Sequence, residues 1–186
     1  VSAGKGHAIY TEGWGDTIVI EGKAADSIFD AGSGNDNIAI NGGSNITVKG
    51  GTGNDTYIIS LAKSGLNFKI DQSDASASDN DVLQLSDYAS EDFSYRISDS
   101  GNLILVHKDG GSLEVQNWNN SRLIAAFSDC TSNMSMDINK SGSYVLGPTT
   151  NKVYFSGSHL DVNLNVTKGL PLEFDFSAYD NIDLRY

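Results

Sequence analysis

Two segments of the chain, 31–40 (AGSGNDNIAI) and 50–59 (GGTGNDTYII), carry the same pattern of glycine, asparagine, aspartate and apolar residues. The pattern can be written as the nonapeptide G-G-x-G-x-D-x-U-x, in which U is a large apolar residue. Its glycines allow main-chain angles that a Cβ would forbid. Its aspartate offers a hard oxygen ligand, and its apolar residue points into a core. A chain that repeats this cycle is predicted to wind into a solenoid of short strands and tight turns.

The sixth-place aspartate of this pattern recurs along the first sixty residues. Aspartates in phase with the pattern are Asp16, Asp26, Asp36 and Asp55, and a weakened copy has Asn45 near this place. The eighth-place residues expected to face the core are Ile18, Ile28, Ile38, Thr47 or Val48, and Tyr57. Because side chains alternate along a strand, the residues two places later are expected on the same face, and these are Ile20, Ile40 and Ile59.

Two repeats are expected to form one turn of the solenoid, because each short strand is followed by a loop that reverses the chain. Loops two repeats apart then stack along the same edge. The first edge contains loops 12–16, 31–36 and 50–55, and the second edge contains loops 3–8, 22–26 and 42–45. The first edge keeps its aspartates and most of its glycines, whereas the second has largely lost them. We therefore expect a metal ion on the first edge only. Ca²⁺ suits two stacked loops because it takes 6–8 oxygen ligands in flexible geometry.

The two full copies resemble the calcium-binding nonapeptide repeats of the RTX (repeats-in-toxin) proteins. In that family the ion lies between stacked loops and is bound by the sixth-place aspartate and by earlier loop carbonyls. The resemblance implies a best site between loops 31–36 and 50–55, formed by Gly32, Gly34, Asn35, Asp36, Gly51, Gly53, Asn54 and Asp55. It implies a second site between loops 12–16 and 31–36, with Asp16 as a ligand. Loop 12–16 departs from the pattern, because it looks one residue short and has Trp14 where a small residue is usual.

A metal-free solenoid is the alternative for the same loops. Asparagine, aspartate and glycine form turns without calcium, so the loop carboxylates would then be solvated. Two full copies with two further aspartates in phase favour calcium.

The sequence after residue 60 also predicts β-structure. Apolar alternation in 81–88, 93–98, 102–108 and 112–118, with turns at 99–102 and 108–111, predicts antiparallel strands. This part resembles the segment that caps the roll in RTX proteins, through Asp81, Leu83, Leu85, Val115 and Trp118. The resemblance covers roughly residues 12–128. The expected fold is all-β: a parallel β-roll over 1–60, an antiparallel or irregular β cap over 61–128, and a further β-rich segment over 129–186 that could continue a degenerate roll.

Composition limits the classes of partner that the chain can bind and the ways in which it can be stabilised. The net charge of −12 and the pI of about 4.4 disfavour nucleic acid and anionic lipid as partners. No apolar run approaches the length of a membrane span. Cys130 is the only cysteine, so bound metal is a candidate for the stabilisation that disulfides would otherwise supply. We expect the chain to be part of a longer protein, because repeat sequence begins almost directly after Val1.

No catalytic constellation stands out in the sequence. His7, His107 and His159 lack zinc spacing, and neither a Gly-x-Ser-x-Gly elbow nor a phosphate loop occurs. We therefore expect a non-enzymatic calcium-binding module of a large secreted bacterial toxin or exoprotein, exported unfolded and folding outside the cell, as the resemblance implies. The alternative is a domain that binds a host-cell receptor or a glycan. Trp14, Trp118 and Tyr10 could form a sugar platform for such a partner, although packing in the core or cap is the preferred interpretation.

Overall fold

The computed structural model describes residues 4–61, 65–118, 123–129, 131–133, 135–138, 141–146, 152–155, 160–166 and 173–176. Regular structure in these residues is almost entirely β-strand, with a short 3₁₀ helix, η2 (Ser90–Asp92). The expectation of an all-β chain is therefore confirmed. Among the described residues, no helix is long and apolar enough to cross a membrane.

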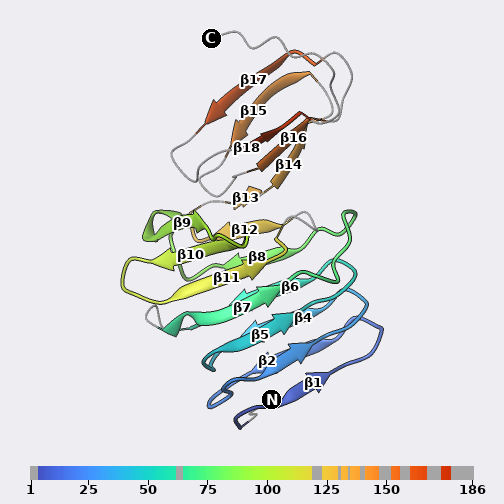
Figure 1. Cartoon of the computed structure of the whole chain (residues 1–186), viewed down its shortest axis with the longest axis vertical. Coiled ribbons are helices and arrows are strands. Elements are labelled where there is room, and N and C mark those ends of the chain that lie inside the picture. Colours follow the sequence, from blue (N-terminus) through green and yellow to red (C-terminus); the bar gives the residue numbers. More distant parts are fainter. Residues whose placement is uncertain are drawn as a thin grey trace.

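Two sheets run through the first two thirds of the chain (Figure 1). In spatial order, sheet I contains β1 (Ala8–Tyr10), β3 (Ile28–Asp30), β5 (Ile46–Lys49), β7 (Asn67–Asp71), β11 (Ser112–Gln116), β10 (Leu103–His107) and β9 (Phe93–Ile97). Sheet II contains β13 (Thr131–Asn133), β12 (Ile124–Phe127), β8 (Val82–Leu85), β6 (Thr56–Ile59), β4 (Asn37–Ile40) and β2 (Thr17–Ile20). From β1 to β8, consecutive strands alternate between the two sheets, and neighbours within each sheet are parallel.

The core lies between these two sheets. Strands of sheet II bury alternate residues, such as Ile38 and Ile40 in β4, as a strand with one covered face requires. The opposing strands of sheet I contribute residues such as Phe29, Val48 and Ile70. All of these belong to one apolar cluster that extends from Ile18 to Phe127.

One predicted core residue is wrong. Ile28 is 42% exposed, while its neighbour Phe29 is fully buried. The cause lies in the preceding turn, where Asp26 has a left-handed φ of 48° and Ser27 is the buried residue. This turn therefore ends one residue later than the pattern predicts, which reverses the faces of the strand that follows.

Residues 61–128 continue both sheets. β7 and β8 pair in parallel with β5 and β6, and β11 and β12 then pair in parallel with β7 and β8. Only β9, β10 and β11 form the antiparallel hairpins predicted from the turns at 99–102 and 108–111. The prediction of antiparallel strands over 81–118 is therefore correct for β9, β10 and their pairing with β11, but wrong for β8, which pairs in parallel with β6 and follows the register of the coils before it. The predicted strands are present, but β12 was not anticipated.

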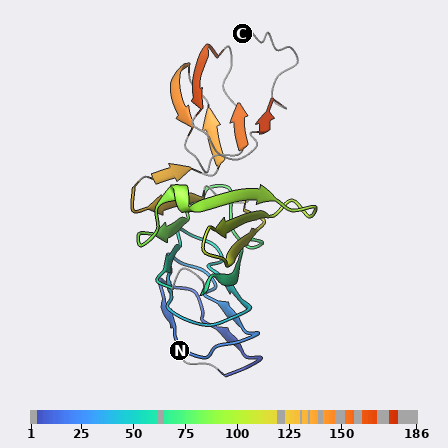
Figure 2. The same cartoon turned by 90° about the vertical axis from the view of Figure 1, so that its left-hand side faces the viewer.

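The segment after residue 133 has its own small sheets, which lie beyond β13 in Figures 1 and 2. One contains β14 (Ser135–Ile138), β16 (Lys152–Phe155) and β18 (Glu173–Asp175), and the other contains β15 (Gly142–Leu146) and β17 (Val162–Val166). Both are parallel, and consecutive strands again alternate between sheets. A separate apolar cluster around Val153 and Phe155 packs this part. Cys130 and His159 lie outside the described residues.

Candidate metal centre

Four loops stack along one edge of the two sheets. Loops 11–16, 31–36, 50–55 and 72–81 each lead from a strand of sheet I to the following strand of sheet II. An isolated parallel bridge between Ser33 and Thr52 links the second loop to the third. The first three loops are those predicted to share the first edge. Loop 72–81 extends this edge by one position.

A ladder of aspartates joins these loops from coil to coil. The main-chain N–H of Asp16 donates to Oδ1 of Asp36 (2.6 Å), and that of Asp36 donates to Oδ1 of Asp55 (2.9 Å). The N–H of Asp55 donates in the same way to Oδ1 of Asp81 (2.9 Å). Each carboxylate therefore satisfies a main-chain donor of the coil before it, and one oxygen per aspartate is used in this way.

A ladder of asparagines runs beside the aspartates in the opposite direction. Asn35 Oδ1 accepts from the N–H of Asn54 (2.8 Å), and Asn54 Oδ1 accepts from the N–H of Asn80 (2.7 Å). Asn35 and Asn54, both predicted site residues, thus use their side-chain oxygens to hold the next loop.

The first three aspartates of the ladder each have a second carboxylate oxygen that is buried without a hydrogen bond. This holds for Oδ2 of Asp16, Asp36 and Asp55. Asp36 and Asp55 are each 1% exposed. Burial raises the pKa of Asp36, and it raises the pKa of Asp55 to about 7, with the charges of Asp81, Asp36 and Asp79 adding to the effect. Buried anions of this kind need either a proton or a cation.

The four glycines predicted for the site adopt left-handed or related angles. Their φ values are 90° for Gly32, 132° for Gly34, 95° for Gly51 and 119° for Gly53. A Cβ on Gly51 would collide with the carbonyl oxygen of Gly32, and one on Gly53 with that of Gly34. These positions require glycine both for the main-chain angle and for the close stacking of the two loops.

Loop 11–16 differs from the other two in having Trp14 at the place of Gly34, as predicted, but the prediction that it is one residue short is wrong. Strand pairing aligns Tyr10 with Asp30 and Thr17 with Asn37, so no residue is missing. Its glycines occupy other places, and none of its residues has a positive φ. Trp14 lies against Gly34 of the next loop through its main chain, and the residue is 86% exposed. Asp16 therefore joins the ladder from a loop of different shape.

The second edge uses its polar residues differently. Asp26 is exposed, accepts a hydrogen bond from Asn45 Nδ2 (2.8 Å) and pairs with Lys5 (3.3 Å). These partners lower the pKa of Asp26. Ser27 is the buried residue of this loop and accepts from the N–H of His7 (3.1 Å). The edge thus places a neutral hydroxyl where the first edge places a carboxylate.

Two acidic residues of loop 72–81 at this edge were not identified as site residues from the sequence. Asp81 occupies the sixth-place position of loop 72–81, and Asp79 Oδ2 accepts from the N–H of Gly53 (3.1 Å). The signal was Asn80-Asp81 followed by an alternating strand, which matches Asn35-Asp36 and Asn54-Asp55. It was missed because the spacing from Asp55 is 26 residues instead of 19.

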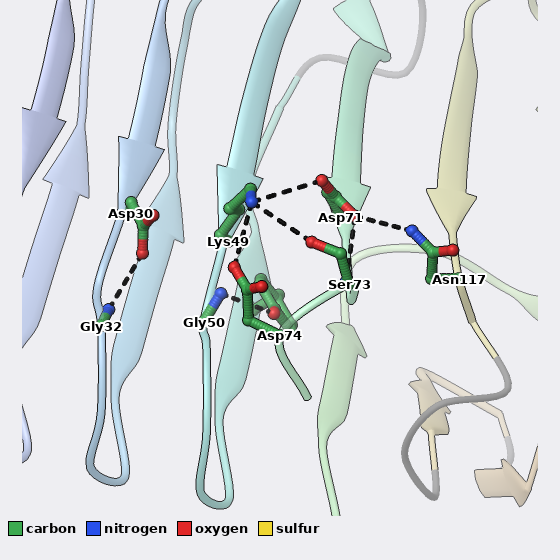
Figure 3. A network of polar contacts seen from close by, with 9 residues as sticks. Asp30, Gly32, Lys49, Gly50, Asp71, Ser73, Asp74 and Asn117 are labelled. Atoms are coloured by element: carbon green, nitrogen blue, oxygen red, sulfur yellow. Dashed lines mark hydrogen bonds and ion pairs between the residues drawn. The ribbon is translucent and has the colours of Figure 1, made fainter. Parts of the chain in front are cut away.

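Other carboxylates near this edge are neutralised within the protein (Figure 3). Lys49 Nζ lies 3.0 Å from Asp74 Oδ2, 3.6 Å from Asp71 Oδ2 and 3.2 Å from Ser73 Oγ. Asp71 Oδ1 also accepts from Asn117 Nδ2 (2.9 Å). This network fastens the start of loop 72–81 to β5 without a metal ion.

The remaining residues singled out from the sequence lie elsewhere. Trp118 is buried and donates to the carbonyl of Gly101, as cap packing predicts, whereas the exposed Trp14 contradicts the packing prediction. The two tryptophans therefore do not form one platform. His107 is buried between Tyr88 and Phe93. Within the described residues, no three His, Cys, Asp or Glu side chains form a metal cluster.

No protein-family model matches the chain, and no curated protein matches it significantly.

The residues of loops 31–36 and 50–55 fit a hard cation. Asp36 and Asp55 each bring one buried carboxylate oxygen without a hydrogen-bond partner, and the two turns stack closely because their glycines have no Cβ. Main-chain carbonyls of the turns would complete a set of oxygen ligands. Calcium accepts such mixed carboxylate and carbonyl sets. The donors contain no sulfur and no imidazole, so softer metals are disfavoured.

Proposed function

We propose that this chain is a non-catalytic calcium-binding β-roll, in which Asp36 and Asp55 hold the ion between loops 31–36 and 50–55. The observation that carries the proposal is the pair of buried Oδ2 atoms with no hydrogen-bond partner. Calcium would supply positive charge to these carboxylates. Asp16 offers a third such oxygen, so a second ion between loops 11–16 and 31–36 belongs to the proposal.

The proposed setting is a large secreted bacterial toxin or exoprotein that folds after export. Extracellular calcium modules bind with Kd values of about 10⁻⁴–10⁻³ M, so trace cytosolic calcium leaves them empty. At about ten times Kd, one site stabilises the folded state by roughly 1.4 kcal/mol. Calcium-dependent folding of this kind would keep the chain unfolded until it reaches a calcium-rich medium.

Thermal unfolding with and without calcium tests this function. Circular dichroism in excess chelator and then in millimolar calcium should show strand content and melting temperature rising together. Asp36→Ala should reduce that rise and the calcium stoichiometry measured by calorimetry. Asp26→Ala is the matched control, because its exposed carboxylate belongs to the second edge. Identical melting curves in chelator and calcium would leave a metal-free solenoid as the better description.

A second candidate function, glycan or receptor binding, is favoured by the aromatic residues of the first coil. Tyr10 is 67% exposed and Trp14 is 86% exposed. Exposed aromatic rings can stack on sugars, which the acidic surface would not prevent. Binding on a glycan array that is lost in Trp14→Ala would support this second function.

A further inference from the structure

Loops 31–36 and 50–55 differ in one matched pair of residues. Ala31 begins the first loop and Gly50 begins the second, because Asn37 and Thr56 are aligned by strand pairing. The core residue that follows is Ile38 in the first coil and Tyr57 in the second, and these two are also aligned. The first coil thus pairs the methyl group of Ala31 with the aliphatic side chain of Ile38. The second coil pairs Gly50, which has no side chain, with the phenol of Tyr57.

The phenol reaches the interior of loop 50–55. Tyr57 is 1% exposed, and its Oη accepts from the main-chain N–H of Gly50 (2.9 Å). Gln72 Nε2 lies 3.4 Å from the same oxygen as a second donor. Because Oη accepts from both groups, its own hydrogen remains available to be donated.

Gly50 connects this phenol to the ladder carboxylate. A Cβ built on Gly50 would collide with Asp55 Oδ2 and would lie 2.7 Å from Tyr57 Oη. The hydroxyl and the buried carboxylate oxygen therefore both lie close to the space where a Cβ of residue 50 would be. The aligned residue of the preceding coil, Ala31, has a methyl group at this position and is buried. Asp55 Oδ2 makes no hydrogen bond, to this phenol or to any other group that the structure describes, so the phenol is its neighbour across the space beside Gly50.

We propose that Tyr57 is a positioning residue for the metal centre: its phenol holds the start of loop 50–55 through the N–H of Gly50, borders Asp55 Oδ2 and so fixes the place of that oxygen beside the ion. This inference rests on the proposed calcium function and adds a residue to it. Outer partners of metal ligands commonly change affinity by about 10–100-fold when removed. The loop with Gly50 and Tyr57 thus has a support that the loop with Ala31 and Ile38 lacks.

The test compares two deletions of a buried phenol oxygen in the full chain. Tyr57→Phe should weaken calcium binding about tenfold by calorimetry. Tyr88→Phe is the control, because Tyr88 Oη donates to the carbonyl of Leu61, away from the loops of the first edge. It should lower the melting temperature equally in chelator and in calcium and leave the calcium Kd unchanged. Equal calcium affinity in wild type and Tyr57→Phe would overturn the inference while leaving the calcium function intact.

A second substitution tests the phenol without disturbing the ligand. Tyr57→Ile introduces the residue that the preceding coil has at the aligned place and retains Gly50, where a Cβ would collide with Asp55 Oδ2. This variant should retain wild-type strand content in chelator and show the same loss of calcium affinity. Wild-type affinity in Tyr57→Ile would show that Tyr57 only fills space. If wild type itself binds no calcium, the proposed function fails, and the inference about Tyr57 fails with it.

Discussion

At the scale of single residues, the two oxygens of each ladder aspartate have different environments. In Asp55, Oδ1 is occupied by the N–H of Asp36, while Oδ2 is buried without a partner. A substitution can therefore separate the hydrogen bond from the negative charge at this position. Asp55→Asn keeps an oxygen that accepts the N–H of Asp36 and removes the negative charge.

Asp55→Asn is predicted to change stability in opposite directions with and without calcium. In chelator at pH 8, the variant should melt about 2–4 °C higher. It removes a buried charge that destabilises the folded state of the wild type by about 1 kcal/mol. In millimolar calcium it should melt below wild type, because a charged ligand is lost. Calorimetric scans in both media measure this. A variant that is less stable in both media would show that the carboxylate is held by protein donors alone.

The pKa of Asp55 predicts the pH dependence of the calcium-free protein. Its folded-state pKa is about 7, against roughly 3.9 in an unfolded chain, so the folded state binds the proton more tightly. The contribution of this group is therefore favourable at low pH and is lost as pH rises from about 4 to about 7. In chelator, the stability of wild type relative to Asp55→Asn should decrease over this window, as measured by urea unfolding. With excess calcium the trend should reverse, because the ion stabilises the ionised carboxylate.

The motif predicted the ladder positions of the repeats but not all of their surroundings. Asp16, Asp36 and Asp55 share the first edge because the nonapeptide phase determines which way a loop residue points. Asp81 was missed because the long loop before it places it 26 residues after Asp55, which breaks the 19-residue spacing of the repeats. Ile28 was placed wrongly because the left-handed angle at Asp26 adds one residue to the turn, which a residue count cannot detect.

At the scale of elements, each strand of the repeats depends on a neighbour from the next coil. β6 pairs with β8 through Thr56 and Val82, and β5 pairs with β7 through Thr47 and Lys69. Without residues 61–128, the last repeat would expose a strand edge in both sheets and the apolar face of Tyr57 and Ile59.

A fragment of residues 1–60 is therefore predicted to remain disordered even in calcium. It keeps the proposed ligands but loses the strands that cover the last coil and the Asp81 acceptor for the N–H of Asp55. Amide peaks in a nuclear magnetic resonance spectrum should stay poorly dispersed in millimolar calcium. Dispersed, calcium-dependent peaks would mean that the repeats need no cover.

Strand positions were more predictable than strand directions. Alternation located β8 to β11, because half-buried strands carry a period of two. The parallel pairing of β7, β8 and β12 could not be read from that period, since it depends on the coils to which these strands add. β12 was missed because two of its four residues are alanine, which is a weak strand former.

At the scale of the whole molecule, the described residues contain two separate apolar clusters. The larger extends from Ile18 to Phe127, and the smaller is centred on Val153 and Phe155. Truncation after residue 128 is therefore predicted to leave the calcium-induced rise in melting temperature within about 2 °C of wild type. Differential scanning calorimetry in chelator and calcium would measure it. A truncated chain without any calcium response would place part of the metal centre, or its support, in the last third of the sequence.

The coil-to-coil hydrogen bonds also determine how the protein would respond to a pulling force. Within the described residues, Asp16 bonds to the coil after it, and each later coil is held through its own aspartate and strands. Tension on the first coil should therefore detach one coil at a time. Each release would lengthen the chain by about 65 Å, the extended length of a 19- or 20-residue repeat. A bound ion between two coils would raise the force needed to separate them. Calcium concentration would therefore set the force at which the molecule extends.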